Sequence, residues 1–394
     1  MDTIRGYLLC NCNKFVKRAQ KAEFFTIFCV LVGAFFVLAG NAIGQPEIQN
    51  LGGDFSHGGS VTILGYGFGE KVPAAPLRYE NFEDGTLGER LKTQENGGYF
   101  TFDSALSPSY SEEIQRIPGE ICAFQDFSET GNQTIGLKNT LDFTVDVDTI
   151  YVSGWTYRHD YENTAQYCEN AKIWINVYGH REYGDYPYTS EYPQARLDSY
   201  YATTHANFYS LNEDGMSVDS DSEFGEAKHF NEWFRMERYL EVGDPGVANG
   251  STWMAYNGEI FAENSGMYHT TSKTFKEVFV SHYWRINPYD NPELPQAHIK
   301  IYWGELYMDN TQARVEIGDD VVFANCTHRE IQIPHTWDSN QVGFTVNQGT
   351  FAGGENLFLF VIDENGNPSL GVPIVLDSNL IIDGPGIPSQ PIVN

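Results

Sequence analysis

The stretch from Trp233 to Ala262 constrains the fold most, because its residues alternate between two kinds of position. Apolar residues occupy every second place over part of it (Phe234, Met236, Leu240, Val242), and polar or aromatic residues fill the places between them (Trp233, Arg235, Glu237, Tyr239, Glu241). A period of two is that of a β-strand with one buried face. The Gly-Asp-Pro-Gly loop that follows and the Asn257-Gly258 pair are turn signals, so the stretch predicts antiparallel strands.

Similar runs recur along the chain and predict an all-β protein. Strands are expected at about 149–157, 171–178, 277–284 and 299–310, with turn-forming residues between them. Long helical periodicity is absent outside the N-terminus. Many short strands without intervening helices favour antiparallel sandwiches. The 394 residues are enough for a large β domain, expected at 78–311, together with a smaller one.

Residues 1–42 read as a secretory signal peptide. Several lysines and arginines precede the apolar run Phe24–Ala39, and the small residues Gly40 and Ala42 suit a cleavage site. A permanent anchor is the alternative, but the run is shorter than the roughly 20 residues that a membrane span needs. We therefore expect a secreted or cell-surface protein with no stable membrane span after cleavage.

Charge and cysteine content exclude several classes of protein. The net charge is −29, with 53 acidic and 24 basic residues, which excludes nucleic acid as a general partner because phosphate binding needs a basic surface. Outside residues 1–42 only Cys122, Cys168 and Cys326 remain, so at most one intramolecular disulfide can form. Their spacing matches no zinc motif.

Two segments at opposite ends of the chain resemble the halves of an IPT/TIG domain, a small immunoglobulin-like β-sandwich. Residues 45–77 contain the strand and Gly-x-Gly-Phe-Gly pattern of its opening (residues 60–69), and residues 312–376 contain later strands with an Asn365-Gly366 turn. The resemblance implies one small sandwich formed from both chain ends and interrupted by an insertion. Two unrelated β segments are the alternative. The tail, residues 377–394, is rich in glycine and proline and is expected to be extended or disordered.

The inserted region resembles concanavalin-like jelly rolls, the architecture of laminin-G modules, carbohydrate-binding modules and heparin-lyase-like polysaccharide lyases. The resemblance rests on the Asn-Phe-Glu-Asp-Gly opening (81–85), the Trp-x-Arg-x-Glu strand (233–237) and the closing Tyr-Met-Asp-Asn (307–310). It implies a jelly-roll sandwich. It also implies a structural Ca²⁺ held between Glu83 and Asp309, since oxygen ligands suit that ion.

Sugar-binding residues are predicted in two places. Trp233, Glu237 and Tyr239 share a strand face that offers rings for stacking and a carboxylate for hydrogen bonds to hydroxyls; an ordinary solvated face is the alternative. Seven tyrosines lie between residues 178 and 201, and this segment adds His180, Arg181 and Tyr183 as candidates. A loop packed on its own aromatic rings is the alternative there.

Lyase chemistry is a second possibility, whereas glycoside hydrolysis is disfavoured. Glu237 and Glu241 would lie about 13 Å apart along a strand, too far for the carboxylate pairs of hydrolases. Gln296 and His298 resemble the Gln-x-His element of alginate-lyase-type jelly rolls, with Arg235 as a clamp for a substrate carboxylate and Tyr283 for proton transfer. The Arg-[Ser/Thr]-Glu-Leu strand of that family is absent, as is its Tyr-x-Lys-x-Gly-x-Tyr strand.

Together these features predict a secreted protein that binds a polysaccharide or cell-surface glycan. The alternatives are a polysaccharide lyase that cleaves uronic-acid polysaccharides by β-elimination, and a structural surface or adhesion protein with no small ligand.

Overall fold

The computed structural model describes residues 44–93, 96–98, 108–126, 147–160, 170–179, 195–200, 205–210, 220–222, 231–267, 275–285 and 299–377. The chain divides into two units, residues 1–45 and 46–394, and the description that follows concerns the second unit. No helix in the described ranges is both long and apolar enough to cross a membrane.

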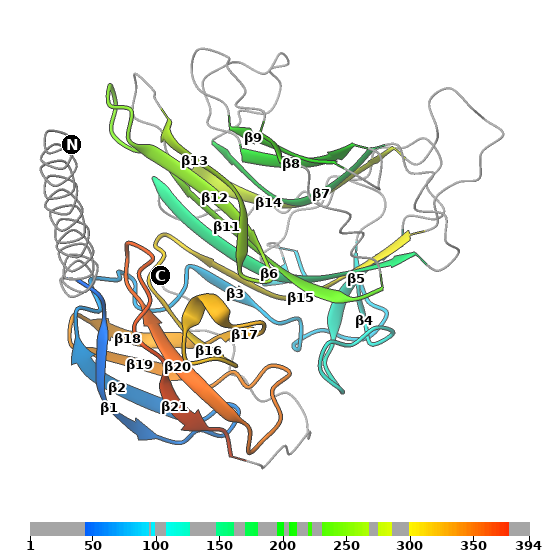
Figure 1. Cartoon of the computed structure of the whole chain (residues 1–394). Helices are drawn as coiled ribbons and strands as arrows, with labels where there is room; N and C mark the ends of the chain where they lie inside the picture. The colour runs from blue at the N-terminus through cyan, green and yellow to red at the C-terminus, as the bar shows by residue number, and fades with distance from the viewer. Residues whose placement is uncertain are drawn as a thin grey trace, which may run out of the picture. The chain divides into compact units, whose positions relative to one another are not determined.

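The largest element is an antiparallel sheet of eight strands, called here the large sheet (Figure 1). Its strands run in the order β13 (Glu259–Met267), β12 (Gly250–Tyr256), β11 (Trp233–Glu241), β6 (Thr149–Asp160), β15 (Ile299–Asp309), β5 (Cys122–Asp126) and β4 (Ser109–Ser111), and β3 (Arg78–Glu80) also pairs with β15. The β12–β13 hairpin turns at Asn257 and Gly258, whose φ values of 45° and 85° suit the turn predicted there. Local turn chemistry thus fixes this edge of the sheet.

The second sheet has five strands, in the order β10 (Ser220–Ser222), β9 (His205–Ser210), β8 (Ala195–Tyr200), β7 (Asn170–Gly179) and β14 (Phe275–Arg285). Figure 1 shows it facing the large sheet. Its neighbouring strands all pair antiparallel. The two sheets form the larger of the two predicted sandwiches.

The small sandwich is built from both ends of the described chain. One sheet has the order β1 (Glu47–Gly53), β2 (Ser60–Tyr66), β19 (Gln341–Thr345) and β18 (Ile333–Asp338). The other has the order β17 (Arg329–Ile331), β16 (Arg314–Gly318), β20 (Asn356–Ile362) and β21 (Val372–Val375), and a short 3₁₀ helix, η3 (Phe323–Asn325), precedes β17. β2 pairs directly with β19, so segments almost 280 residues apart share one sheet.

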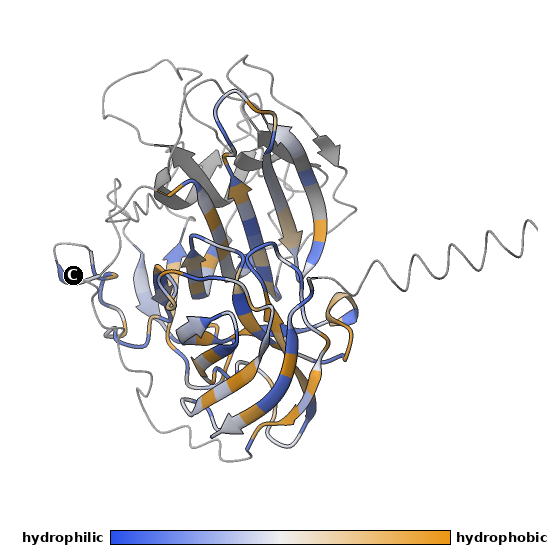
Figure 2. Cartoon of the chain, turned by 90° about the vertical axis from the view of Figure 1, so that its left-hand side faces the viewer, coloured by the Kyte–Doolittle hydropathy of each residue, from blue (hydrophilic) through white to orange (hydrophobic). Residues whose placement is uncertain are grey.

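A single apolar core joins the two halves of the small sandwich. Its buried residues come from β2 and the residues just after it (Val61, Ile63, Phe68) and from the C-terminal strands (Val315, Ile317, Val342, Phe344, Leu357, Leu359, Val361). Figure 2 shows apolar and polar residues alternating along the strands. The predicted fold class is confirmed: the protein is all-β, with a large antiparallel sandwich and a smaller one formed from both chain ends. The narrower IPT/TIG resemblance stays a prediction.

Both described cysteines outside the N-terminal segment are free thiols. Cys122 and Cys326 are buried and unpaired. Burial raises the pKa of the Cys122 thiol to about 12, so it is inert as a nucleophile near neutral pH. Cys168 lies outside the described residues.

Candidate functional site

The polar face of β11 contacts the small sandwich, and we call this contact the seam. Arg235, Glu237 and Tyr239 are only 3%, 1% and 6% exposed. Tyr239 belongs to a cluster of buried rings from the large sheet that packs against Ile331 and Ile333 of the small sandwich. The prediction that Glu237 and Tyr239 face a sugar is therefore corrected, because a protein surface already covers this strand face.

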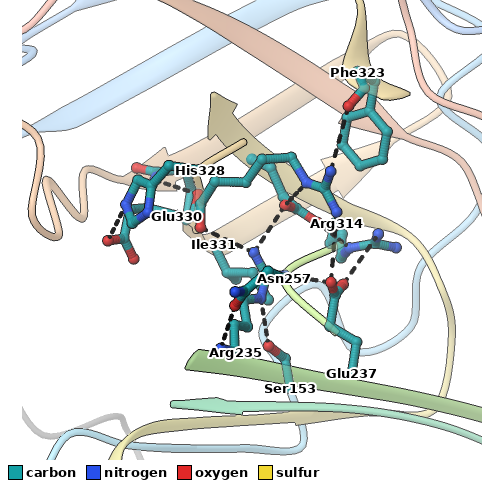
Figure 3. Close-up of polar contacts among 12 residues, drawn as sticks. Ser153, Arg235, Glu237, Asn257, Arg314, Phe323, His328, Glu330 and Ile331 are labelled. Carbon is teal, nitrogen blue, oxygen red and sulfur yellow. Dashed lines mark hydrogen bonds and ion pairs between the residues drawn. The ribbon is translucent and has the colours of Figure 1, made fainter. Parts of the chain in front are cut away.

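Arg235 lies at the centre of a buried ion-pair network at the seam (Figure 3). Its Nη1 donates to Glu316 Oε2 at 3.0 Å and to the Arg329 carbonyl at 3.1 Å. Its Nη2 donates to Glu237 Oε1 at 3.1 Å, and its Nε donates to Ser153 Oγ at 2.8 Å. The guanidinium group is thus fully engaged inside the protein. A role for Arg235 in clamping a substrate carboxylate would require these bonds to break.

Glu316 receives donors from three guanidinium groups. Besides Arg235, Arg314 Nε donates to its Oε1 at 2.6 Å and Arg329 Nε donates to its Oε2 at 3.0 Å. Burial alone would raise the pKa of this carboxyl, but the three positive charges outweigh burial and hold the pKa well below its usual range. Glu316 is therefore ionised at every physiological pH.

A second charged cluster extends along the seam around Arg116. Its Nη1 donates to Glu330 Oε1 at 2.6 Å, and its Nη2 lies 3.3 Å from Glu305 Oε2 and 4.0 Å from Glu120 Oε1. Burial raises the pKa of Glu120 to about 8. Burial alone would raise the pKa of Glu330, but the positive charge of the neighbouring Arg116 outweighs burial and lowers the pKa to about 2. One arginine therefore serves three carboxylates, and at least one of them keeps its proton near neutral pH.

The two residues predicted to hold Ca²⁺ have partners within the protein. Asp309 is fully buried and forms an ion pair with the equally buried Lys71, and it accepts a hydrogen bond of 2.8 Å from the Tyr307 hydroxyl. Glu83 Oε1 accepts the Ile121 amide at 2.7 Å. The described residues include no group of three His, Cys, Asp or Glu side chains placed to hold a metal. A lysine ammonium thus supplies the positive charge that Asp309 needs.

Most of the other predicted site residues lie outside the described residues: His180, Arg181, Tyr183, Gln296 and His298. Tyr283 lies in β14, where the register places it opposite Lys172 of β7. Trp233 is half-buried at the start of β11, with its ring edge-on to Tyr157 at 5.6 Å, and it lines a small pocket at the seam.

The register of the second sheet separates its residues into two sets of alternate positions. One set on β7 and β14 is mostly apolar: Ile173 and Ile175 lie opposite His282 and Val280, and His282 is its polar member. The other set is polar or aromatic and continues across four strands, so that Arg285, Asn170, Tyr200 and His205 form one cross-strand row. Residues directly opposite each other share a face of the sheet. We call the face that carries this row the polar face.

Sequence reasoning missed the partners of the seam network. Arg116, Glu316 and Glu330 carry no local signal of their role, because each meets its partners only through the tertiary fold. One signal existed: the run from Arg314 to Gly318 alternates charged and apolar residues, and all five of its residues are buried. A strand of the small sandwich with charged side chains on one face needs a charged surface to cover it.

Comparisons with known proteins show likeness only at the level of structure. No family model matches the chain, and no curated protein matches it. Among solved structures, an alginate lyase (Aly36B) is 12% identical, with a TM-score of 0.43, over 60% of this chain and 97% of that one. An alginate lyase from Aplysia kurodai is 10% identical, with a TM-score of 0.41, over 60% of this chain and 99% of that one. The carbohydrate recognition domain of Emp46p is 9% identical, with a TM-score of 0.37, over 59% of this chain and 95% of that one.

Proposed function

We propose that the protein is an extracellular glycan-binding protein whose ligand lies along the polar face of the second sheet. The observation that carries the proposal is the alternation across that sheet. Polar and aromatic residues such as Lys172, Trp174 and Tyr283 recur at one set of positions, and mostly apolar residues occupy the other set. Aromatic residues interleaved with cations and amides provide stacking surfaces and hydrogen bonds for sugar rings.

The segment that follows β7 extends this proposal. β7 ends at Gly179, and His180, Arg181 and Tyr183 come directly after it in the sequence. We propose that they contribute to the same glycan site. Residues 1–42 support export as a signal peptide, and the strongly acidic composition excludes a general nucleic-acid partner.

Glycan binding is tested by affinity electrophoresis of the purified protein in gels that contain uronic-acid or neutral polysaccharides. Tyr283→Ala should weaken binding by five- to tenfold, because one stacked ring contributes about 1 kcal/mol. Tyr66→Ala is the matched control, since Tyr66 is exposed on the small sandwich and should not affect retardation. Absence of retardation by every polysaccharide would reject the proposal.

A polysaccharide lyase is the second candidate, and the row across β14, β7, β8 and β9 favours it. Removal of the C5 proton of a uronate requires a group that neutralises the carboxylate and a group that accepts the proton. Arg285 and Asn170 are of the first kind, and Tyr200 and His205 are of the second; they occupy opposing positions in one row. Because Arg235 is engaged at the seam, we assign the clamp to Arg285 in this scheme. Gln296 and His298, which immediately precede β15, remain further candidates.

Lyase activity is tested by the ultraviolet absorbance of the unsaturated product on uronic-acid polysaccharides. Tyr200→Phe should lower the rate by about 10²-fold or more if Tyr200 transfers a proton. Tyr209→Phe, the same change one strand away opposite Arg196, should leave most of the rate. A flat absorbance on every uronate, together with retained binding, would leave glycan binding as the function.

A further inference from the structure

Lys71 and Asp309 form a buried pair between two distant parts of the chain. Lys71 lies in the loop between β2 and β3, Asp309 is the last residue of β15, and 238 positions separate them. Lys71 Nζ donates a hydrogen bond to Asp309 Oδ2, and both side chains are 0% exposed. Lys92 and Lys300 also pair with carboxylates, but their side chains are 37% and 21% exposed. Water therefore reaches those two pairs but not the pair at Lys71.

Further hydrogen bonds hold the lysine amine against the carboxyl group. Asn310 Nδ2 donates to the Val72 carbonyl at 3.2 Å, so the next residue along each segment is joined as well. The Asn310 backbone N–H donates to Asp309 Oδ1 at 2.9 Å, and the Tyr307 hydroxyl donates to Oδ2 at 2.8 Å. The two carboxyl oxygens therefore have different partners: Oδ1 accepts from a backbone amide, whereas Oδ2 accepts from a hydroxyl group and from the lysine.

Burial changes the protonation of both groups. It lowers the pKa of Lys71 and raises the pKa of Asp309, because water no longer stabilises either charge, and the attraction between the two charges only partly offsets this effect. Moving one proton from Nζ to Oδ2 along their hydrogen bond converts the ion pair into a neutral amine beside a neutral carboxyl group. An uncharged, desolvated lysine amine is a nucleophile. The buried ion pair is therefore one proton transfer away from a reactive form.

We propose that the Lys71 side chain condenses with the Asp309 carboxyl group to form an intramolecular isopeptide bond. The lone pair of the neutral amine attacks Cγ, and a bond between Nζ and Cγ forms. The nitrogen then gives one proton to Oδ2, which already carries one, and the bond between Cγ and Oδ2 breaks to release one water molecule. The product is a neutral amide, and neither oxidation nor a further reactant is involved.

The surrounding contacts suit each stage of this reaction. Negative charge develops on Oδ1 in the tetrahedral intermediate, and the Asn310 backbone N–H already points at that oxygen, as a donor of an oxyanion hole does. The Tyr307 hydroxyl donates to Oδ2, the oxygen that leaves. Reacting groups held in one geometry behave as if at an effective concentration of about 10⁵–10⁸ M. Folding alone thus brings the two groups to the point of reaction.

The bond closes a covalent ring that contains the whole large sandwich. Its strands, β3 to β15, all lie between Lys71 and Asp309 in the sequence, whereas β2 and β16 on either side belong to the small sandwich. A force that pulls on the two ends of the chain is then carried past the large sandwich, because the new bond is the shorter covalent path. The cross-link therefore protects the large sandwich from unfolding under tension.

The test is mass spectrometry of the full-length protein after denaturation and digestion with trypsin. Trypsin does not cut after a lysine whose Nζ is acylated, so the peptide that ends at Arg78 should keep Lys71 uncut. This peptide should be joined to residues 301–314, and the branched product should be lighter than the two peptides together by about 18 Da, the mass of one water molecule. Lys71→Met removes the nucleophile and should release residues 301–314 as a free linear peptide.

Lys92→Met is the matched control. Lys92 pairs with Asp84 where solvent reaches both side chains, so this variant should give the same branched product as the wild type. The wild-type digest decides the question even if Lys71→Met fails to fold, because it contains either the branched product or the free peptides. The proposal is overturned if the wild type yields free peptides 72–78 and 301–314 without a branched product, or if the branched product persists in Lys71→Met.

Discussion

Replacing Glu316 by glutamine should destabilise the protein strongly. The carboxylate is fully buried and accepts hydrogen bonds from Arg235, Arg314 and Arg329 at 2.6–3.0 Å. Glutamine removes the negative charge and turns an amide N–H₂ toward at least one guanidinium group, so three buried cations share the remaining carboxylate of Glu237. Breaking a buried ion pair from one side costs about 3–5 kcal/mol. We expect a loss of about 4 kcal/mol in the free energy of unfolding.

Urea unfolding at neutral pH measures this loss, and Glu47→Gln is its matched control. Glu47 is exposed and accepts one hydrogen bond from Tyr66, so its replacement should change the free energy of unfolding by less than about 0.5 kcal/mol. If the free energy of unfolding of Glu316→Gln lay within about 1 kcal/mol of the wild-type value, the seam network would not stabilise the protein.

The pH dependence of the same variant gives a second check with a defined sign. The three arginines lower the pKa of Glu316 in the folded protein. A lowered pKa means that its contribution is fully present above the ordinary glutamate value of about 4.3 and is lost as the pH falls through the folded pKa. The gap between wild type and Glu316→Gln should therefore be constant at neutral pH and narrow only in strong acid.

Three further predictions concern other buried groups. Lys71→Met should lower the free energy of unfolding, measured in urea, by about 3–5 kcal/mol, because it leaves Asp309 buried without its cation. EDTA should leave the melting temperature of the wild type unchanged, and a clear fall in that temperature would instead show a bound metal. Burial raises the pKa of Glu80 to about 7, so the free energy of unfolding should fall by about 3 kcal/mol as the pH rises from about 4.5 past 7. Glu80→Gln should remove that fall, and an unchanged pH profile would refute the assignment. Gly258→Ala should lower the free energy of unfolding more than Gly246→Ala does. Both glycines have φ near +80°, but only a Cβ at Gly258 would collide with the Arg329 guanidinium group. Equal losses in the two variants would mean that the turn does not fit closely against the small sandwich.

Most of the fold could be predicted from the sequence, because strand signals are local. The alternation in Trp233–Val242 became β11, and Asn257-Gly258 became the predicted turn. The joining of the two chain ends followed from a resemblance rather than from local pattern, and the β2–β19 pairing agrees with it. The spacing of apolar residues and the choice of turn residues are properties of short segments, so both can be recognised in the sequence without knowledge of tertiary contacts.

The candidate site was harder to predict, because alternation shows that a face is polar but not what covers it. Arg235, Glu237 and Tyr239 suit a sugar-binding face and a charged contact between domains equally well. Their partner Glu316 is about 80 residues away along the chain, and nothing local links the two. Asp309 is the same case: its sequence context suggested a calcium ligand, whereas its partner, Lys71, is 238 residues away.

The measurement that tests the central claim most directly is hydrogen–deuterium exchange of the protein with and without uronic-acid oligosaccharides. Glycan binding on the polar face of the second sheet predicts slower amide exchange in β7, β8 and β14 when the oligosaccharide is present. Exchange in the core strands β16 and β20 of the small sandwich should not change. Unchanged exchange in β7, β8 and β14, with or without slower exchange elsewhere, would contradict the account.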